Sequence, residues 1–367
     1  MSAGNCRWGI LGTAGIARKN WKAIRLAGNA SIVAVASRNE ASASRFINEC
    51  SSQVPFYKCP SAVGSYAALL ERSDVDAVYI PLPTALRREW VIKAAEAGKH
   101  VLGEKPAALN ATEVAEMLAV CKRNNVQYMD GVMFMHSQRL PMIRKILDDQ
   151  NQLGQLRRMT SQFSFPGDAT FCESNIRTSS DLEPYGCLGD LGWYCTRFFL
   201  WVLKGQMPTE VRARTLTPLQ GKSSPAPVPG EFSAELNFPG GVSASFYNSF
   251  LTDHQQWAHL SGSKGYLKLN DFVLPYHAAE VEAFVGKDFF NIENCVFNME
   301  HHLQRFATTE YASGAANAQE VNMIRTFSDL VITQSMDDQW PTWTLKTQRI
   351  LDACFQSAAR NGEAVKL

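Results

Sequence analysis

The first 130 residues repeat one pattern, in which a short apolar run precedes an amphipathic stretch. The run Cys6–Leu11 leads into a helical pattern that Gly28 closes, and the run Ser31–Ala36 leads into a second helical pattern over Ala41–Cys50. Strands of a parallel sheet form continuous apolar runs because crossover helices cover both faces. The pattern therefore predicts an α/β fold with a doubly wound parallel sheet.

The same alternation continues to about residue 130. We expect strands over Val75–Leu82, His100–Gly103 and Val126–Met129, and helices over Ala85–Ala97 and from Asn110 to about Asn124. Gly98 suits the left-handed position that ends a helix, and Asn110 with Glu113 forms a capping box at the start of the next helix. These features define a first domain over residues 1–130.

After residue 131 the pattern changes to longer strands with period two. Met159–Phe165 alternates in this way, and Phe232–Phe238 faces Val242–Phe246 across a Pro-Gly-Gly turn, which indicates a hairpin. Residues 131–367 are therefore expected to form an α+β domain with a large, mostly antiparallel sheet. We expect a surface loop over Gln220–Gly230, and helices over about 318–334 and 344–360 that pack against this second sheet.

Charge and composition favour small-molecule chemistry. The chain has 36 basic and 35 acidic residues, so a nucleic-acid partner is not expected. No apolar run reaches the roughly 18 residues of a membrane span, and no secretion signal opens the chain, so we expect a cytoplasmic protein without a membrane partner. The nine cysteines lack the spacing of a disulfide framework or zinc site, and no metal is expected.

A glycine-containing turn follows the first predicted strand. Its residues are Gly12, Thr13, Ala14, Gly15 and Ile16. Between a strand and a helix, such a turn lets backbone N–H groups and the helix N-terminus bind a pyrophosphate. Ala14 occupies the second small position of the usual GxGxxG or GxGxxA pattern, so the motif is altered. The alternative is a simple glycine turn without a ligand.

The end of the second predicted strand favours NADP over NAD. The residues there are Ser37 and Arg38, and no carboxylate stands where an NAD enzyme holds the ribose 2′-hydroxyl. Ser37 can donate a hydrogen bond to a 2′-phosphate, and Arg38 offers a charged planar fork. The alternative is that Arg38 is a solvated surface arginine.

A third motif, Glu104-Lys105-Pro106, follows the strand His100–Gly103. Ligands of doubly wound folds bind at the carboxyl edge of the strands, so the Lys105 ammonium can approach a substrate hydroxyl or carbonyl there. It can also lower the pKa of a neighbouring acid. An exposed lysine before a proline turn is an equal alternative.

Together these motifs resemble the glucose-fructose oxidoreductase and inositol dehydrogenase superfamily, Gfo/Idh/MocA. The matching strings are the turn Gly12–Ala17, Tyr79–Thr84, Ala94–Val101, Glu104-Lys105-Pro106 and Leu188–Tyr194, which contains Asp-x-Gly-x-Tyr. The chain looks especially similar to the branch of dimeric dihydrodiol dehydrogenases, NADP-dependent D-xylose dehydrogenases and plant relatives. The resemblance implies a Rossmann domain over 1–130 and a substrate-binding and oligomerisation domain over 131–367.

The resemblance also implies a catalytic group. Lys105 would orient and polarise the substrate, Tyr194 would donate or accept the proton, and Asp190 would bind a substrate hydroxyl. A free tyrosine has a pKa of about 10, which a nearby ammonium and an oxidised nicotinamide would lower. The alternatives are that Tyr194 is a core residue of an apolar helix and that Asp190 is a helix cap.

Further residues are assigned by the same resemblance. Pro83, Thr84, Glu104 and Lys105 would line the cofactor site. His136 and Arg139 could touch nicotinamide or substrate, or could have a structural role at a domain interface. Arg177 could line the substrate site or be a surface arginine. Arg87 stands where many members have histidine, so no role is transferred to it.

The predicted function is NADP-dependent hydride transfer to or from a CH–OH or C=O group of a sugar, polyol or trans-dihydrodiol. The resemblance implies a homodimer formed through the C-terminal sheet. One alternative is a catalytically silent NADP-binding regulator or scaffold. Another is an enzyme whose tightly held nicotinamide is used transiently.

Overall fold

The computed structural model of the chain describes residues 4–367, which form two compact units. The first unit contains the residues up to His136 together with Asp181–Pro184 and Ser313–Arg349. The second unit contains Ser137–Ser180, Tyr185–Ala312 and Ile350–Leu367. The chain therefore crosses between the units several times.

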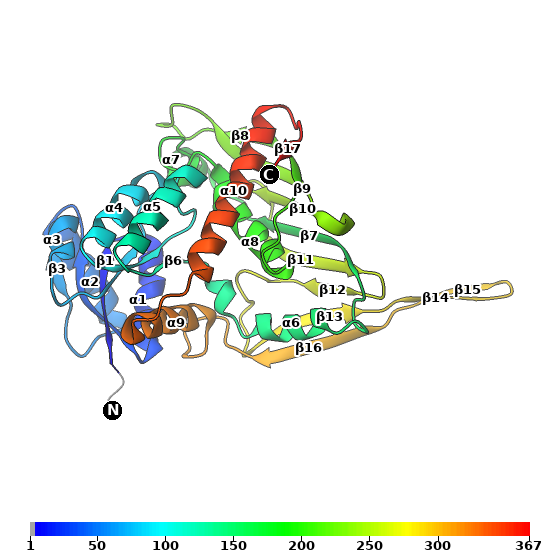
Figure 1. Ribbon diagram of the computed structural model, residues 1–367, viewed down its shortest axis with the longest axis horizontal. Coiled ribbons are helices and arrows are strands. Elements are labelled where there is room, and N and C mark those ends of the chain that lie inside the picture. The colour runs from blue at the N-terminus through cyan, green and yellow to red at the C-terminus, as the bar shows by residue number, and fades with distance from the viewer. Residues whose placement is uncertain (1–3) are drawn as a thin grey trace. The chain divides into compact units, whose positions relative to one another are not determined.

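The first unit contains a six-stranded sheet with the order β3-β2-β1-β4-β5-β6 (Figure 1). All neighbouring strands pair in parallel. Their bounds are β1 (Cys6–Leu11), β2 (Ala30–Ala36), β3 (Ser61–Val63), β4 (Ala77–Ile80), β5 (His100–Gly103) and β6 (Tyr128–Asp130). This arrangement confirms the predicted doubly wound sheet.

Helices surround this sheet. They are α1 (Gly15–Ala27), α2 (Glu40–Gln53), α3 (Tyr66–Leu70), α4 (Thr84–Glu96), α5 (Ala111–Arg123), the 3₁₀ helix η1 (Met133–His136) and α9 (Gln319–Thr333). Gly28 and Gly98 have φ values of 85° and 71°, as expected for residues that end helices. The Asn110 side chain accepts a hydrogen bond from the Glu113 N–H, so the predicted cap is confirmed.

The prediction that helix 318–334 packs against the second sheet is wrong, because α9 belongs to the first unit. Its Phe327 ring lies 5.2 Å from the Trp8 ring of β1, and the Trp8 indole N–H donates to Ser328 Oγ at 3.1 Å. Periodicity predicts a helix with an apolar face, but it does not say which sheet that face covers.

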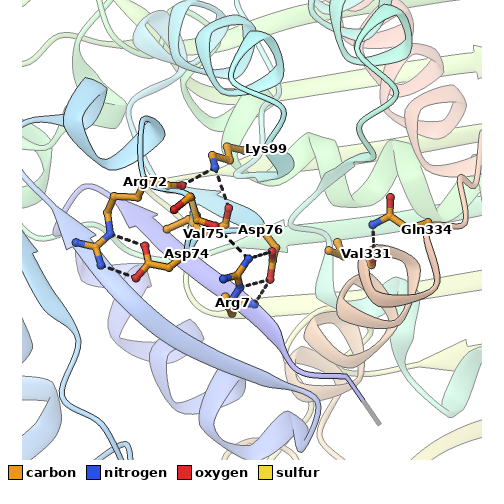
Figure 2. A network of polar contacts seen from close by, with 9 residues as sticks. Arg7, Arg72, Asp74, Val75, Asp76, Lys99, Val331 and Gln334 are labelled. Carbon is orange, nitrogen blue, oxygen red and sulfur yellow. Dashed lines mark hydrogen bonds and ion pairs between the residues drawn. The ribbon is translucent and has the colours of Figure 1, made fainter. Parts of the chain in front are cut away.

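A polar network at the amino ends of the strands fixes β1 beside β4 and β5 (Figure 2). The Arg7 guanidinium donates to Asp76 at 2.6 and 2.9 Å. Lys99 Nζ donates to the carbonyl oxygens of Arg72 and Val75, and burial lowers the pKa of this lysine. The network lies at the edge of the sheet opposite the predicted cofactor site.

The second unit contains a nine-stranded sheet with the order β16-β13-β12-β11-β7-β10-β9-β8-β17. Its neighbours pair antiparallel except for β7 and β10, so the predicted, mostly antiparallel sheet is confirmed. The bounds are β7 (Leu156–Ser164), β8 (Glu210–Leu219), β9 (Val228–Asn237), β10 (Ser243–Ser249), β11 (Gln255–Gly262), β12 (Tyr266–Leu269), β13 (Glu280–Gly286), β16 (Leu303–Thr309) and β17 (Val365–Lys366).

Two details of the second unit refine the expectations. The hairpin β9–β10 pairs as predicted, with Phe246 opposite Ala234. The loop over 220–230 is shorter than predicted, because Val228–Gly230 are buried and belong to β9. Helix α10 (Gln339–Ala359) runs from the first unit into the second, where Ser357 Oγ accepts from the Ala213 N–H at 2.9 Å.

The remaining elements of the second unit are shorter. They are α6 (Arg139–Asp148), α7 (Ala169–Ser174), η2 (Ile176–Thr178), η3 (Leu188–Gly192), α8 (Trp193–Val202) and η4 (Pro239–Gly241), with a separate hairpin of β14 (Phe289–Glu293) and β15 (Val296–Glu300). None of the helices in residues 4–367 is long and apolar enough to cross a bilayer.

The packing of α9 on β1 predicts the effect of a cavity. Phe327→Ala should lower the free energy of unfolding by about 3–5 kcal/mol, because the Phe327 ring is fully buried against Trp8. Leu216→Ala, at a half-exposed position, is the control and should change it by less than about 0.5 kcal/mol. Urea unfolding followed by tryptophan fluorescence measures both, and equal effects would contradict the assigned packing.

Candidate active site

The cofactor candidates lie at one edge of the first unit's sheet. Gly12 follows β1, Ser37 follows β2, Pro81 follows β4 and Glu104 follows β5. These four strands are neighbours and parallel, so their carboxyl ends meet at the same edge. The structure therefore brings together the stretches of sequence in which all the predicted cofactor residues lie.

The turn after β1 leaves room for an anionic group. Gly12 has a φ of 114°, which residues with a side chain rarely adopt, and a Cβ atom built on it would lie 3.0 Å from Leu82 Cδ2. A Cβ on Gly15 would meet no atom within 4 Å. Ala14 provides no side-chain cap for α1, and the first turn holds no acidic residue. The first-turn N–H groups therefore suit a pyrophosphate.

The end of β2 provides a positive charge. Ser37 is buried, and its N–H donates to the Val63 carbonyl at 3.1 Å. Arg38 is exposed and forms no ion pair with any residue in the described part of the chain. Burial raises the pKa of Tyr66, and the charge of Arg38 partly offsets that increase. Because Tyr66 Oη lies 3.8 Å from a Cβ built on Gly12, this charge lies near the glycine turn.

The turn after β4 is held by two buried ionic groups. The Thr84 N–H and hydroxyl donate to the Glu183 carboxylate at 2.9 and 2.5 Å. Arg87 donates to the Leu82 carbonyl at 2.6 Å and to Thr84 Oγ1 at 3.3 Å. Pro83 offers α4 no side-chain cap, so the Glu183 carboxylate takes that place at the helix N-terminus.

The sequence carries no local signal of this arrangement. Arg87 received no role, yet it is 2% exposed and fixes the turn that contains Pro83 and Thr84. Glu183 was missed entirely, because its partner Thr84 lies 99 positions away and no spacing motif joins them. A backbone bond from the Ala85 N–H to the Leu182 carbonyl at 3.2 Å completes the contact.

The Glu-Lys-Pro turn after β5 is held through its glutamate. The Tyr79 hydroxyl donates to Glu104 Oε1 at 2.6 Å, and the Lys105 N–H donates to Oε2 at 3.2 Å. Burial, followed by the Glu104 charge, raises the pKa of Tyr79 well above its usual value, so the phenol stays a neutral donor. Glu104 therefore orients the backbone of Lys105, whose side chain is half-buried.

In the second unit, Asp190 lies on the π-helical turn η3 and Tyr194 on the adjoining α8. The segment is helical, as expected, but its first turn is wider than an α-helical turn. Arg177 Nε contacts Asp190 Oδ1 at 2.8 Å, and the Asp190 side chain is 12% exposed. The Tyr194 ring packs edge-on against Phe163 at 5.6 Å. Arg177, predicted separately, is thus an ion-pair partner of Asp190.

Close contact with neighbouring side chains explains the glycine between Asp190 and Tyr194. A Cβ atom on Gly192 would lie 2.8 Å from Asn248 Oδ1 and 3.1 Å from Leu188 Cδ1. Asn248 is fully buried on β10, and its Nδ2 donates to the Phe163 carbonyl at 3.3 Å. The small glycine in the Gly-Asp-Leu-Gly string therefore lets η3 pack directly against the second sheet.

His136 and Arg139, the two candidates that follow β6, contact other residues of the protein. Arg139 is buried, and its Nη1 lies 2.9 Å from Asp271 Oδ1 within the second unit. His136 stacks on Trp340 at 4.6 Å within the first unit, and its carbonyl accepts from Asn322 Nδ2 at 3.3 Å. A contact of either residue with nicotinamide or substrate stays a prediction.

A doubly wound sheet with an uncapped helix N-terminus, an exposed arginine and a lysine at its carboxyl edge is typical of dinucleotide-binding proteins. Residues 6–132 match the oxidoreductase family with an NAD-binding Rossmann fold, Gfo/Idh/MocA, and residues 142–268 match a Gfo/Idh/MocA C-terminal domain. The chain belongs to the Gfo/Idh/MocA oxidoreductase family.

Named relatives support this assignment. A dTDP-3,4-didehydro-2,6-dideoxy-alpha-D-glucose 3-reductase of Saccharopolyspora spinosa is 34% identical over 71% of this chain and 73% of its own length. A D-xylose 1-dehydrogenase (NADP(+)) of Haloferax volcanii is 34% identical over 75% and 79%, respectively. The crystal structure of a 3-ketoreductase from Actinomadura kijaniata with NADP and TDP-benzene has a TM-score of 0.78, 27% identity and coverage of 96% and 98%.

The contact between Thr84 and Glu183 predicts energetic coupling. Glu183→Gln and Thr84→Val should each lower the free energy of unfolding by about 1–3 kcal/mol, because each weakens a charge-assisted, buried hydrogen bond. The double variant should be less destabilised than the sum, with a coupling energy of at least about 1 kcal/mol. Urea unfolding of the four proteins measures this, and additive effects would contradict the contact.

Proposed function

We propose that this protein transfers a hydride between NADP(H) and a carbon that bears a hydroxyl or carbonyl group on a sugar, polyol or trans-dihydrodiol. The observation that carries the proposal is the meeting of the four cofactor stretches at the carboxyl edge of adjacent strands. Support for the substrate class comes from relatives named D-xylose 1-dehydrogenase and, in Mus musculus at 29% identity, trans-1,2-dihydrobenzene-1,2-diol dehydrogenase.

NADP is the cofactor in this proposal. Gly12, Thr13, Ala14, Gly15 and Ile16 would hold the pyrophosphate through backbone N–H groups at the start of α1. Ser37 and Arg38 would bind the 2′-phosphate, and no carboxylate at the end of β2 would repel it. The turns with Pro83, Thr84, Glu104 and Lys105 would border the remaining part of the cofactor.

When bound, NADP supplies or accepts the hydride at its nicotinamide ring. In the proposed mechanism, Tyr194 gives or takes the substrate hydroxyl proton, and the Lys105 ammonium favours the ionised phenol and polarises the substrate oxygen. Asp190 accepts a hydrogen bond from a further substrate hydroxyl. Its ion pair with Arg177 orients the Asp190 carboxylate.

We also propose a role for each domain and a location in the cell. Residues 1–130 would bind the dinucleotide, and residues 131–367 would bind substrate and form a homodimer through the second sheet. A cytoplasmic location is supported by the nine cysteines, all of which are free thiols and therefore suit a reducing compartment.

Arg38 should decide between the two dinucleotides. Arg38→Ala should raise the KM for NADP⁺ about 10–100-fold and leave that for NAD⁺ nearly unchanged, because a charge-assisted contact worth about 1.5–3 kcal/mol is lost. Arg45→Ala, at an exposed arginine on α2, is the matched control. Initial rates with both cofactors measure the effect, and a parallel loss for NAD⁺ would refute the 2′-phosphate role.

Removal of the catalytic pair should affect kcat. Lys105→Met and Tyr194→Phe should each lower kcat about 10²–10⁴-fold, because proton transfer is lost. Both should still bind NADPH, because the contacts at the glycine turn and at Arg38 remain. Tyr276→Phe, at an exposed tyrosine, is the control and should retain full activity. NADPH formation with a panel of aldoses, polyols and dihydrodiols measures turnover, and NADPH fluorescence measures binding.

Three outcomes would overturn parts of this account. Unchanged turnover in both variants would remove Lys105 and Tyr194 from the mechanism. Tight NADPH binding by the wild-type protein without turnover on any substrate would favour a regulator or scaffold. Nicotinamide retained through purification, without net NADPH formation, would indicate a transiently used cofactor.

A further inference from the structure

A short stretch of chain leaves the second unit and joins the first. Ser137–Ser180 and Tyr185–Ala312 belong to the second unit, whereas Asp181–Pro184, the crossing segment, belongs to the first. The crossing segment lies between Arg177 on η2 and Asp190 on η3. The backbone therefore links Asp190, which is proposed to bind substrate, and its partner Arg177 to residues that pack within the first unit.

The crossing segment binds the first turn of α4 through three hydrogen bonds. The Thr84 N–H and hydroxyl donate to the two carboxylate oxygens of Glu183 at 2.9 and 2.5 Å. The Ala85 N–H donates to the Leu182 carbonyl at 3.2 Å. Thr84 and Glu183 are 2% and 9% exposed, respectively. Since both carboxylate oxygens accept from one residue, the contact fixes the orientation of the segment as well as its position.

Packing connects Thr84 to the glycine turn that is proposed to hold the pyrophosphate. Leu82 Cδ2 would lie 3.0 Å from a Cβ atom built on Gly12, so the two turns are in contact. Arg87 is buried and donates to the Leu82 carbonyl at 2.6 Å and to Thr84 Oγ1 at 3.3 Å. A dinucleotide that restrains either turn therefore also restrains the donors that hold Glu183.

Both flanks of the crossing segment are anchored in the second unit. The Ser180 N–H donates to Ser224 Oγ at 2.9 Å. On the other flank, a Cβ atom built on Gly186 would collide with the Pro229 carbonyl oxygen, so the chain packs closely against β9 there. Because only a few residues separate these two anchors, a displacement of Glu183 strains the chain on both sides.

The flanks also carry the residues that are proposed to act on substrate. Arg177 and Asp190 lie within seven positions of Glu183. Arg177 Nε contacts Asp190 Oδ1 at 2.8 Å, and Tyr194 follows on α8. One short run of chain thus joins the cofactor turn to this ion pair. Buried, directional contacts that connect two binding sites can give the sites a coupling free energy.

We propose that Glu183 is a positioning residue that couples the cofactor turn at Thr84 to the segment that carries Arg177 and Asp190. NADP(H) at the carboxyl edge of the sheet restrains Thr84, Thr84 holds Glu183, and Glu183 keeps Asp190 in place for a substrate hydroxyl. Because coupling of binding sites is reciprocal, bound substrate in turn tightens the binding of NADP(H). This inference rests on the proposed function and adds to it a residue that acts through others.

Hydrogen–deuterium exchange of the full-length protein, with and without NADP⁺, tests the coupling without a substrate. In the wild type, NADP⁺ should slow amide exchange in residues 12–16 and, at least about fivefold, in residues 176–194. Glu183→Ala should keep the protection of residues 12–16 and lose most of the protection of residues 176–194. Glu173→Ala, at an exposed carboxylate on α7 that contacts Lys222, is the matched control and should behave like the wild type.

Glu183→Gln provides a second test with a variant that preserves the size of the side chain. It loses the charge to which the two Thr84 donors bind. At saturating NADP⁺ it should raise the KM of the aldose, polyol or dihydrodiol that is turned over fastest at least about fivefold. The Kd for NADP⁺ alone should change less than about twofold, because the glycine turn and Arg38 are untouched. A purely structural role would lower kcat in proportion to the folded fraction and leave both constants unchanged.

Each contrary result has its own meaning. If NADP⁺ does not protect residues 12–16 of the wild type, the proposed cofactor site is wrong and the coupling falls with it. Protection of residues 12–16 without protection of residues 176–194 would overturn the coupling alone. Equal protection of residues 176–194 in wild type and Glu183→Ala, or an unchanged substrate KM in Glu183→Gln, would do the same. If the alanine variant fails to fold, the glutamine variant takes its place in the exchange experiment.

Discussion

The candidate site depends on the parallel pairing of β1, β2, β4 and β5 in the first unit. Parallel pairing places four carboxyl ends, and the loops after them, along one edge of the sheet. The start of α1 at that edge has neither a side-chain cap nor an acidic residue, so its N–H groups suit an anion. The exposed guanidinium of Arg38 adds a positive charge at the same edge. An NADP phosphate chain has the complementary charge.

Buried polar contacts hold this edge in place. Glu183 and Arg87 fix the turn at Thr84 from two directions, and Tyr79 fixes Glu104 next to Lys105. Such groups are costly to bury unless every partner is present, so they specify the loop conformations more strongly than apolar packing would. The loops that border the proposed cofactor site are therefore preorganised within the first unit.

Much of the fold could be predicted from the sequence, because the signals that specify it are local. The apolar runs, the caps at Gly28 and Asn110 and the hairpin β9–β10 each depend on residues close in the chain. The missed features depend on long-range packing. The sequence does not indicate that the apolar face of α9 covers β1, that Glu183 contacts Thr84, or that Arg177 pairs with Asp190.

The most direct test of the account is a crystal structure of the protein with NADP⁺ and a non-reactive polyol. The account predicts the pyrophosphate at the N-terminus of α1, the 2′-phosphate on Arg38, and the Lys105 ammonium and Tyr194 hydroxyl within reach of the same substrate oxygen. A dinucleotide bound away from the carboxyl edge of the sheet, or Lys105 and Tyr194 on opposite sides of the nicotinamide ring, would contradict it.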